Sequence, residues 1–266
     1  MSLPDIPEPL SLSVQNLNVT IAGQQRLSNI NIEVSAGSAL GIMSPLHAGT
    51  SELLWAINRL LPEVSGVKMS GHILVGGTNI NQVPLNLLRQ RVGLLIPVPL
   101  ARTPYGEVAT ALRAKVSSAH TDDLVEKAMR RAGIWRQVRD SLHQEYNHDD
   151  PILLRLLCLA RTLALNPGLL LLDDPTRGLD ILGRARFEEV ILKAMTAGDI
   201  TLVWGTREPD QAGRVADKVA FLCAGEIVET GHTRSLFEHP VDPRTESFLT
   251  GDYRSLSGAK KVVKSE

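Results

Sequence analysis

The sequence predicts an α/β fold with a mixed-sheet core, an antiparallel β subdomain and a helical subdomain. Three observations predict it. Apolar and polar residues alternate at 12–19 and 30–34, as in antiparallel strands with one buried face. Continuous apolar runs at 39–43 and 169–172 are typical of parallel strands that are covered on both faces. Between 103 and 165 the apolar residues recur with helical spacing.

The first buried run leads into a phosphate-binding type of connection. Residues 39–43 are expected to form a short strand, and residues 44–49 a loop that contains Gly and Pro. Residues 50–61 follow with apolar side chains at helical spacing. A strand, such a loop and a helix in this order are the frame of a phosphate-binding loop.

The remaining elements follow from the same patterns. The helical stretch 103–165 is broken near 146–151, and the apolar run 169–172 ends in Asp173-Asp174-Pro175. Further strands are expected at 73–75, 92–96 and 201–204, a helix at 182–195, and a hairpin formed by 219–222 and 226–229.

Composition limits the class of protein. The chain has 266 residues, 43% hydrophobic and 21% charged, which is typical of a folded globular protein. A net charge of −1 gives no indication of a nucleic-acid partner. No apolar run reaches about 20 residues, the length that crosses a bilayer, and residues 1–9 lack the pattern of a secretory signal. We therefore expect a cytoplasmic protein, unless a membrane partner holds it at the inner surface.

Cys158 and Cys223 each lie among apolar residues, which predicts two buried thiols in a reducing compartment.

Residues 1–254 are expected to form one domain with a helical insert at about 103–165. Residues 255–266 are polar and Lys-rich and are expected to be a flexible tail.

Residues 166–180, with the sequence NPGLLLLDDPTRGLD, resemble the Walker B strand and D-loop of ABC transporter ATP-binding subunits. The order of elements over residues 11–253 is similar to that family, which implies a P-loop NTPase-like core. Residues 56–60, 88–93 and 243–251 are more similar to the phosphate-import subfamily, although importers of oligopeptides and amino acids share much of the rest.

The resemblance assigns a Walker A register with several replacements. Ser51 keeps the hydroxyl that ligates Mg²⁺, and Gly49 keeps the close backbone approach, but Thr50 stands at the lysine position. Ser44 and His47 replace two glycines, and a His side chain is poorly suited to positive φ. We therefore expect no tight triphosphate site in this loop. The register is Ser44, Pro45, Leu46, His47, Ala48, Gly49, Thr50 and Ser51.

The other nucleotide-facing motifs are altered as well. Thr20 and Ile21 stand where the family has an aromatic residue that stacks on adenine, and Pro97 stands at the Q-loop glutamine. Proline offers no side-chain ligand and stiffens a loop that moves in the family. The signature segment aligns with Asp149, Asp150 and Pro151, and two carboxylates would repel a triphosphate. Asp150 followed by Pro151 nevertheless predicts a capped helix start.

The resemblance also assigns the Walker B and switch positions. Asp173 keeps the carboxylate for Mg²⁺, and Asp180 keeps the D-loop carboxylate. Asp174 replaces the catalytic glutamate and is shorter by one methylene. Arg207 stands at the switch histidine and cannot exchange a proton as imidazole does.

Six altered positions on a regular apolar pattern predict a folded subunit that hydrolyses ATP poorly or not at all. The first hypothesis is a degenerate subunit that docks on an ABC permease, with an intact ATPase as a possible heterodimeric partner. A non-enzymatic regulatory or scaffold protein is the second, and an active phosphate-import ATPase is the third. By resemblance the cofactor would be ATP with Mg²⁺.

Overall fold

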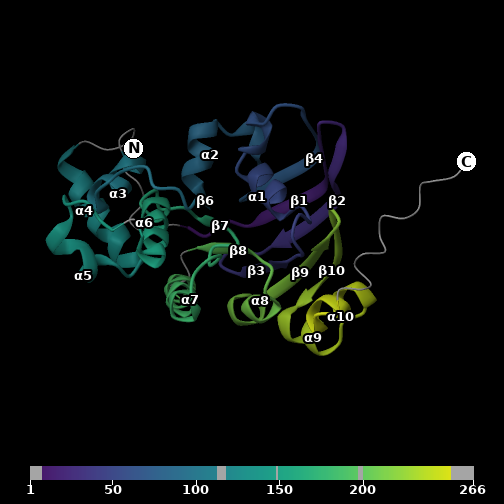
Figure 1. The fold of residues 1–266 in the computed structure, drawn as a ribbon. Coiled ribbons are helices and arrows are strands. Elements are labelled where there is room, and N and C mark those ends of the chain that lie inside the picture. The colour runs from purple at the N-terminus through teal and green to yellow at the C-terminus, as the bar shows by residue number, and fades with distance from the viewer. Residues whose placement is uncertain (1–7, 113–117, 148, 197–199, 253–266) are drawn as a thin grey trace, which may run out of the picture.

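The computed structural model describes residues 8–112, 118–147, 149–196 and 200–252. Two sheets and a separate group of helices make up this part of the chain (Figure 1). The helices α3 to α6 gather on one side of the molecule, away from the antiparallel strands β1, β2 and β4. The predicted α/β class with an antiparallel sheet and a mixed sheet is confirmed.

The smaller sheet is antiparallel, with the strand order β2-β1-β4-β5. Buried and exposed residues alternate along much of β1 and β2, because one face of this sheet packs on the core and the other meets solvent. Ala22 and Gly23 connect these two strands with φ angles of 49° and 80°. The strands are β1 (Leu12–Ile21), β2 (Gln24–Val34), β4 (Val67–Val75) and β5 (Thr78–Asn79).

The larger sheet has the order β10-β9-β3-β8-β7-β6. All its neighbouring strands are parallel except the edge strand β10, which pairs antiparallel with β9. β3, β8 and the apolar part of β7 are fully buried, as the continuous apolar runs predict. The strands are β3 (Ala39–Met43), β6 (Val92–Leu95), β7 (Leu169–Asp173), β8 (Thr201–Thr206), β9 (Lys218–Cys223) and β10 (Glu226–His232).

Alternate residues of the larger sheet belong to different hydrophobic clusters. Leu171 packs with the antiparallel sheet and α1 (Thr50–Ile57), whereas Leu170 packs with α6 (Pro151–Leu163) and α7 (Ile181–Thr196). Trp204 and Phe187 anchor the second cluster with a ring-centroid separation of 5.9 Å. The sheet therefore lies in the middle of the core and holds its loops between two packed layers.

Helices α3, α4 and α6 pack against one another through apolar side chains such as Val108, Met129 and Leu156. The helix break predicted near 146–151 is present, because Asp150 accepts a hydrogen bond of 3.0 Å from the Leu153 amide and starts α6. The other α-helices of the described ranges are α2 (Leu85–Arg91), α3 (Pro104–Leu112), α4 (Ser118–Arg131), α5 (Trp135–Val138), α8 (Pro209–Val215), α9 (Thr233–Glu238) and α10 (Pro243–Thr250).

The predicted helix over 50–61 is too long. α1 ends at Ile57, because Arg59 has a φ of 55° and its guanidinium donates to the main-chain oxygens of Ile80 and Val83. Residues 61–63 then form a 3-10 turn. The predicted tail, 255–266, lies outside the described residues.

Both cysteines are buried and free, as the apolar context predicts. Burial raises the pKa of the Cys158 thiol to about 11.

Among the described helices, none combines the length and the apolar character that a membrane span requires.

Candidate functional site

The loop between β3 and α1 contains two residues with positive φ angles. Gly49 has a φ of 115°, and a Cβ there would lie 2.6 Å from the Leu27 side chain. His47 has a φ of 62° and therefore lies in the left-handed region. A histidine side chain was expected to be poorly suited to this conformation. Histidine is one of the non-glycine residues that this region accepts more readily. The connection from β3 to α1 therefore forms although Ser44 and His47 replace two glycines of the family pattern.

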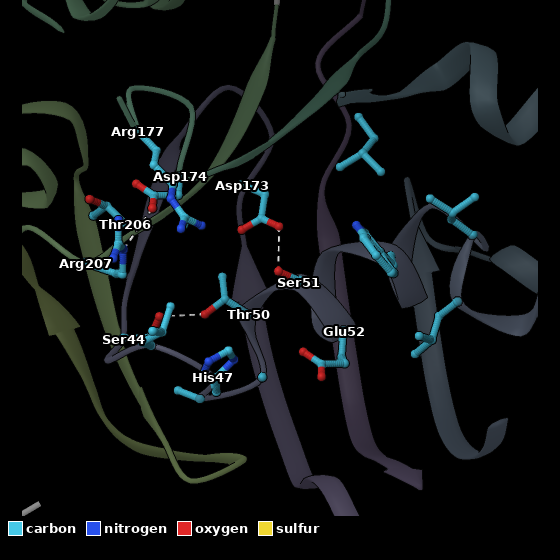
Figure 2. A pocket seen from close by; sticks show the side chains of 18 of the residues that line it. Ser44, His47, Thr50, Ser51, Glu52, Asp173, Asp174, Arg177, Thr206 and Arg207 are labelled. Atoms are coloured by element: carbon cyan, nitrogen blue, oxygen red, sulfur yellow. Dashed lines mark hydrogen bonds and ion pairs between the residues drawn. The ribbon is translucent and has the colours of Figure 1, made fainter. Parts of the chain in front are cut away.

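Ser44 and Thr50, which the resemblance assigns to the first glycine and the lysine of the Walker A loop, form a hydrogen bond with each other. The hydroxyls of Ser44 and Thr50 are 2.7 Å apart, and both residues are buried, at 4% and 9% exposure. Figure 2 shows this pair among the residues that line the pocket. Gly205 faces Thr50 so closely that a Cβ there would lie 2.5 Å from Thr50 Cγ2. Thr50 is thus directed into the loop and contributes no positive charge.

Ser51 and Asp173 form the oxygen pair predicted for a magnesium ion. Ser51 Oγ donates to Asp173 Oδ2 at 2.6 Å across the pocket (Figure 2). Burial raises the pKa of the Asp173 carboxyl, and the hydrogen bond from Ser51 opposes this rise. A hydroxyl and a carboxylate are hard oxygen ligands that suit Mg²⁺. The donor set therefore fits this ion, whereas the loop lacks the lysine that would neutralise a triphosphate.

Asp174 and Arg207, which the resemblance assigns to the catalytic glutamate and switch histidine positions, form an ion pair. Arg207 Nε donates to Asp174 Oδ2 at 2.8 Å, with the side chains 41% and 20% exposed (Figure 2). Asp174 has a φ of 44°, and its amide donates to the Gly205 carbonyl at 2.9 Å. The carboxylate is therefore held by both its backbone and its cationic partner.

The first turn of α1 carries an acidic residue of its own. Glu52 accepts hydrogen bonds of 2.8 and 2.6 Å from Arg26 of β2. Sequence reasoning missed this pair, which joins residues 26 positions apart. Gly49 caps α1 without a side-chain hydrogen bond, so the Glu52 carboxylate supplies the negative charge that a helix N-terminus favours.

These groups line one pocket of about 650 Å³. The whole of the segment 44–51 contributes to it, as do Asp173, Asp174 and Arg207. Ile21 and Pro97, which the resemblance assigns to the adenine-stacking and Q-loop positions, also line the pocket, as do the apolar residues Trp55, Leu60, Leu61, Val64 and Leu94.

The signature and D-loop carboxylates do not line this pocket. Asp150 caps α6, and the Asp149 amide donates to Asn147 Oδ1 at 2.9 Å. Asp180 accepts a hydrogen bond of 2.7 Å from the Gly183 amide at the start of α7. Two pocket arginines, Arg155 of α6 and Arg177 of the turn after β7, were not singled out from the sequence. No spacing rule identifies them, because the topology alone brings them to the pocket.

The segment around Pro97 is fixed by a buried ion pair. Arg161 bonds to Glu107 and also donates to the carbonyls of Ile96 and Val98 at 2.7 and 2.8 Å. Glu107, which is fully buried, accepts the amides of Leu100 and Ala101, both at 2.8 Å. The pair therefore ties both halves of this loop to α3 and α6.

The family model for ABC transporters matches residues 27–177, which is more than half of the chain. The chain belongs to the ABC transporter family and has the fold of its ATP-binding domain.

Within the described residues, no group of three or more His, Cys, Asp or Glu side chains could hold a metal ion.

Solved structures agree with this fold. CbiO1 of Clostridium perfringens, part of the ABC transporter complex CbiONQ, superimposes with a TM-score of 0.75 at 23% identity, over 86% of this chain and 90% of that chain. A bacterial Atm1-family ABC exporter with ATP bound gives a TM-score of 0.73 at 20% identity. That match covers 99% of this chain and 45% of the exporter chain.

Proposed function

We propose that this protein is a nucleotide-binding-domain-like subunit of an ABC transporter that does not hydrolyse ATP. The observation that carries the proposal is the ion pair between Asp174 and Arg207. A carboxylate that polarises water must be available as a general base. Asp174 is instead engaged by a permanently charged guanidinium, which occupies one of its oxygens.

The phosphate loop supports the same proposal. The hydroxyl of Thr50 is hydrogen-bonded to Ser44, and none of the described residues that line the pocket is a lysine. The pair Ser51 and Asp173 would hold Mg²⁺, which would help to bind phosphate oxygens. Without the lysine and the catalytic glutamate, binding of ATP would be weak and its hydrolysis negligible.

The partner follows from the family. We infer that the subunit docks on ABC permease subunits at the inner face of the cell membrane, with an intact ATPase as a possible heterodimeric partner. The similarity of 243–251 to phosphate importers supports phosphate as the transported species. In this proposal, residues 1–254 act as one domain with an insert at 103–165, and 255–266 form a polar tail.

The test is magnesium-dependent ATP hydrolysis by the purified protein. The control is the double variant Ser51→Ala, Asp174→Ala, which lacks both a magnesium ligand and the carboxylate. We expect equal rates from the two proteins. Hydrolysis by the wild type clearly above the control would overturn the proposal. Co-purification with a membrane permease would separate a transporter subunit from a free-standing scaffold.

A further inference from the structure

Two arginines of the pocket, Arg155 and Arg177, are not joined to a carboxylate by an ion pair within the described residues. Arg155 Nη2 donates to the main-chain oxygen of Arg177 at 3.2 Å, so the Arg155 guanidinium lies beside the backbone of Arg177. The Nε atom of Arg155 is buried and has no hydrogen-bond partner within the described residues. Neither arginine forms an ion pair with a residue that the structure describes. A desolvated donor without a partner is costly, so the Nε atom of Arg155 indicates a ligand that would accept from it, and the exposed Arg177 lines the same pocket.

The other charged groups of the pocket are already engaged. Arg26 is paired with Glu52, and Arg207 with Asp174. Asp173 is the acid that remains, and it accepts from Ser51. Among the described residues that line the pocket, four arginines stand against three carboxylates, and Arg155 and Arg177 are the arginines outside its two ion pairs. His47 also lines the pocket and adds no negative charge.

Apolar residues also line the pocket. Trp55, Leu61, Val64, Leu94 and Ile96 line it, and Trp55 provides a large ring surface. A volume of about 650 Å³ lies within the usual range of small-molecule sites. The lining of the pocket thus combines apolar side chains with two guanidinium groups that are outside its ion pairs.

We propose that this pocket binds a small organic anion, with a phosphate monoester or carboxylate group between Arg155 and Arg177 and an apolar body against Trp55. Guanidinium groups recognise both kinds of anion through paired hydrogen bonds. The proposal rests on the proposed function, because tightly bound Mg²⁺-ATP would occupy the same cavity. It places the anion beside the D-loop turn rather than in the loop 44–51.

The test is calorimetric titration without magnesium, with phenyl phosphate, benzoate, benzyl alcohol and inorganic phosphate as probes. We expect one of the two aromatic anions to bind at least tenfold more tightly than benzyl alcohol and inorganic phosphate. Comparing phenyl phosphate with benzoate identifies the preferred anionic group. Arg155→Gln and Arg177→Gln should each weaken this binding at least tenfold. Arg234→Gln, which removes an exposed arginine of α9, is the matched control and should bind as the wild type does.

Three results would overturn the proposal: no binding of either aromatic anion, equal binding of benzyl alcohol, or unchanged affinity in both pocket variants. Thermal unfolding checks that each variant is folded. Arg177 is exposed, so its replacement keeps the test valid even where Arg155→Gln destabilises the chain. ATP hydrolysis is measured separately, so a failure of anion binding and a failure of the proposed function give different results.

Discussion

Arg207 Nε and Asp174 Oδ2 are 2.8 Å apart, so two residues that depart from the family pattern satisfy each other. The pair links the end of β8 to the turn after β7. Its side chains are 41% and 20% exposed, and solvent therefore screens the attraction. The replacements at these positions form a stable local interaction instead of leaving an unpaired carboxylate at the pocket.

A double-mutant cycle measures this interaction. We expect Asp174→Ala and Arg207→Ala to couple by about 0.5–1 kcal/mol in the free energy of unfolding, the range for partly exposed ion pairs. Urea unfolding of the wild type, both single variants and the double variant gives this energy. The coupling should decrease at high salt. Additive single effects would contradict the interaction.

The Ser44 and Thr50 hydroxyls offer a second test. Thr50→Val removes one hydroxyl with little change of shape and leaves the buried Ser44 Oγ without its partner. We expect a loss of about 1–3 kcal/mol in unfolding free energy, because a buried polar group becomes unsatisfied. The double variant Ser44→Ala, Thr50→Val removes both groups and should recover most of that loss. A double variant less stable than Thr50→Val would rule this pairing out.

The sequence predicted the fold better than it predicted the pocket. Continuous apolar runs locate β3 and β7 because a buried strand must be apolar on both faces. The end of α1 was missed, since Arg59 adopts a left-handed conformation to reach carbonyls more than 20 positions away. Local periodicity contains no information on such a contact.

The sequence predicted those site residues that belong to local motifs, and it did not predict the contacts between distant parts of the chain. Motif positions identified Ser51, Asp173 and Asp174, because each is fixed by its neighbours in the chain. Sequence gave no indication that Arg155 approaches Arg177, since these residues come from different elements. Which groups neutralise one another depends on the strand order, and only the structure supplies that order.

Glu107 should be among the residues most important for stability. It is fully buried, bonds to Arg161 and accepts two amides from the segment that contains Pro97. Glu107→Ala leaves a buried guanidinium and two amides without their acceptor. We expect a loss of about 3–5 kcal/mol in unfolding free energy.

The control for Glu107 is Glu126→Ala, which breaks an exposed pair with Arg130 one helical turn away. That variant should lose no more than about 0.5 kcal/mol. Chemical denaturation measures both, and hydrogen exchange should show faster exchange of the Leu100 and Ala101 amides in Glu107→Ala. Equal stability of the two variants would contradict the role assigned to the buried pair.

The Asp173 carboxyl gives the protein a predictable dependence on pH. Burial raises its pKa in the folded state above the ordinary value of 3.8, so the folded chain binds this proton more tightly than the unfolded chain does. This contribution to stability therefore falls as pH rises from 3.8 through the raised value, and it stays low above it. Asp173→Asn removes the charge while its amide oxygen still accepts from Ser51.

We expect Asp173→Asn to be more stable than the wild type at pH 7.5, by about 1 kcal/mol, as for other replacements that relieve a functional site. Its advantage should shrink as the pH is lowered toward the native pKa, because the wild-type carboxyl then becomes neutral as well. Urea unfolding between pH 7.5 and 4.5 measures the difference. Asp140→Asn, which replaces an exposed carboxylate, is the control and should change stability by less than about 0.5 kcal/mol at each pH. An Asp173→Asn variant that is less stable than the wild type at pH 7.5 would mean that the charge is stabilised by the pocket arginines more than burial disfavours it.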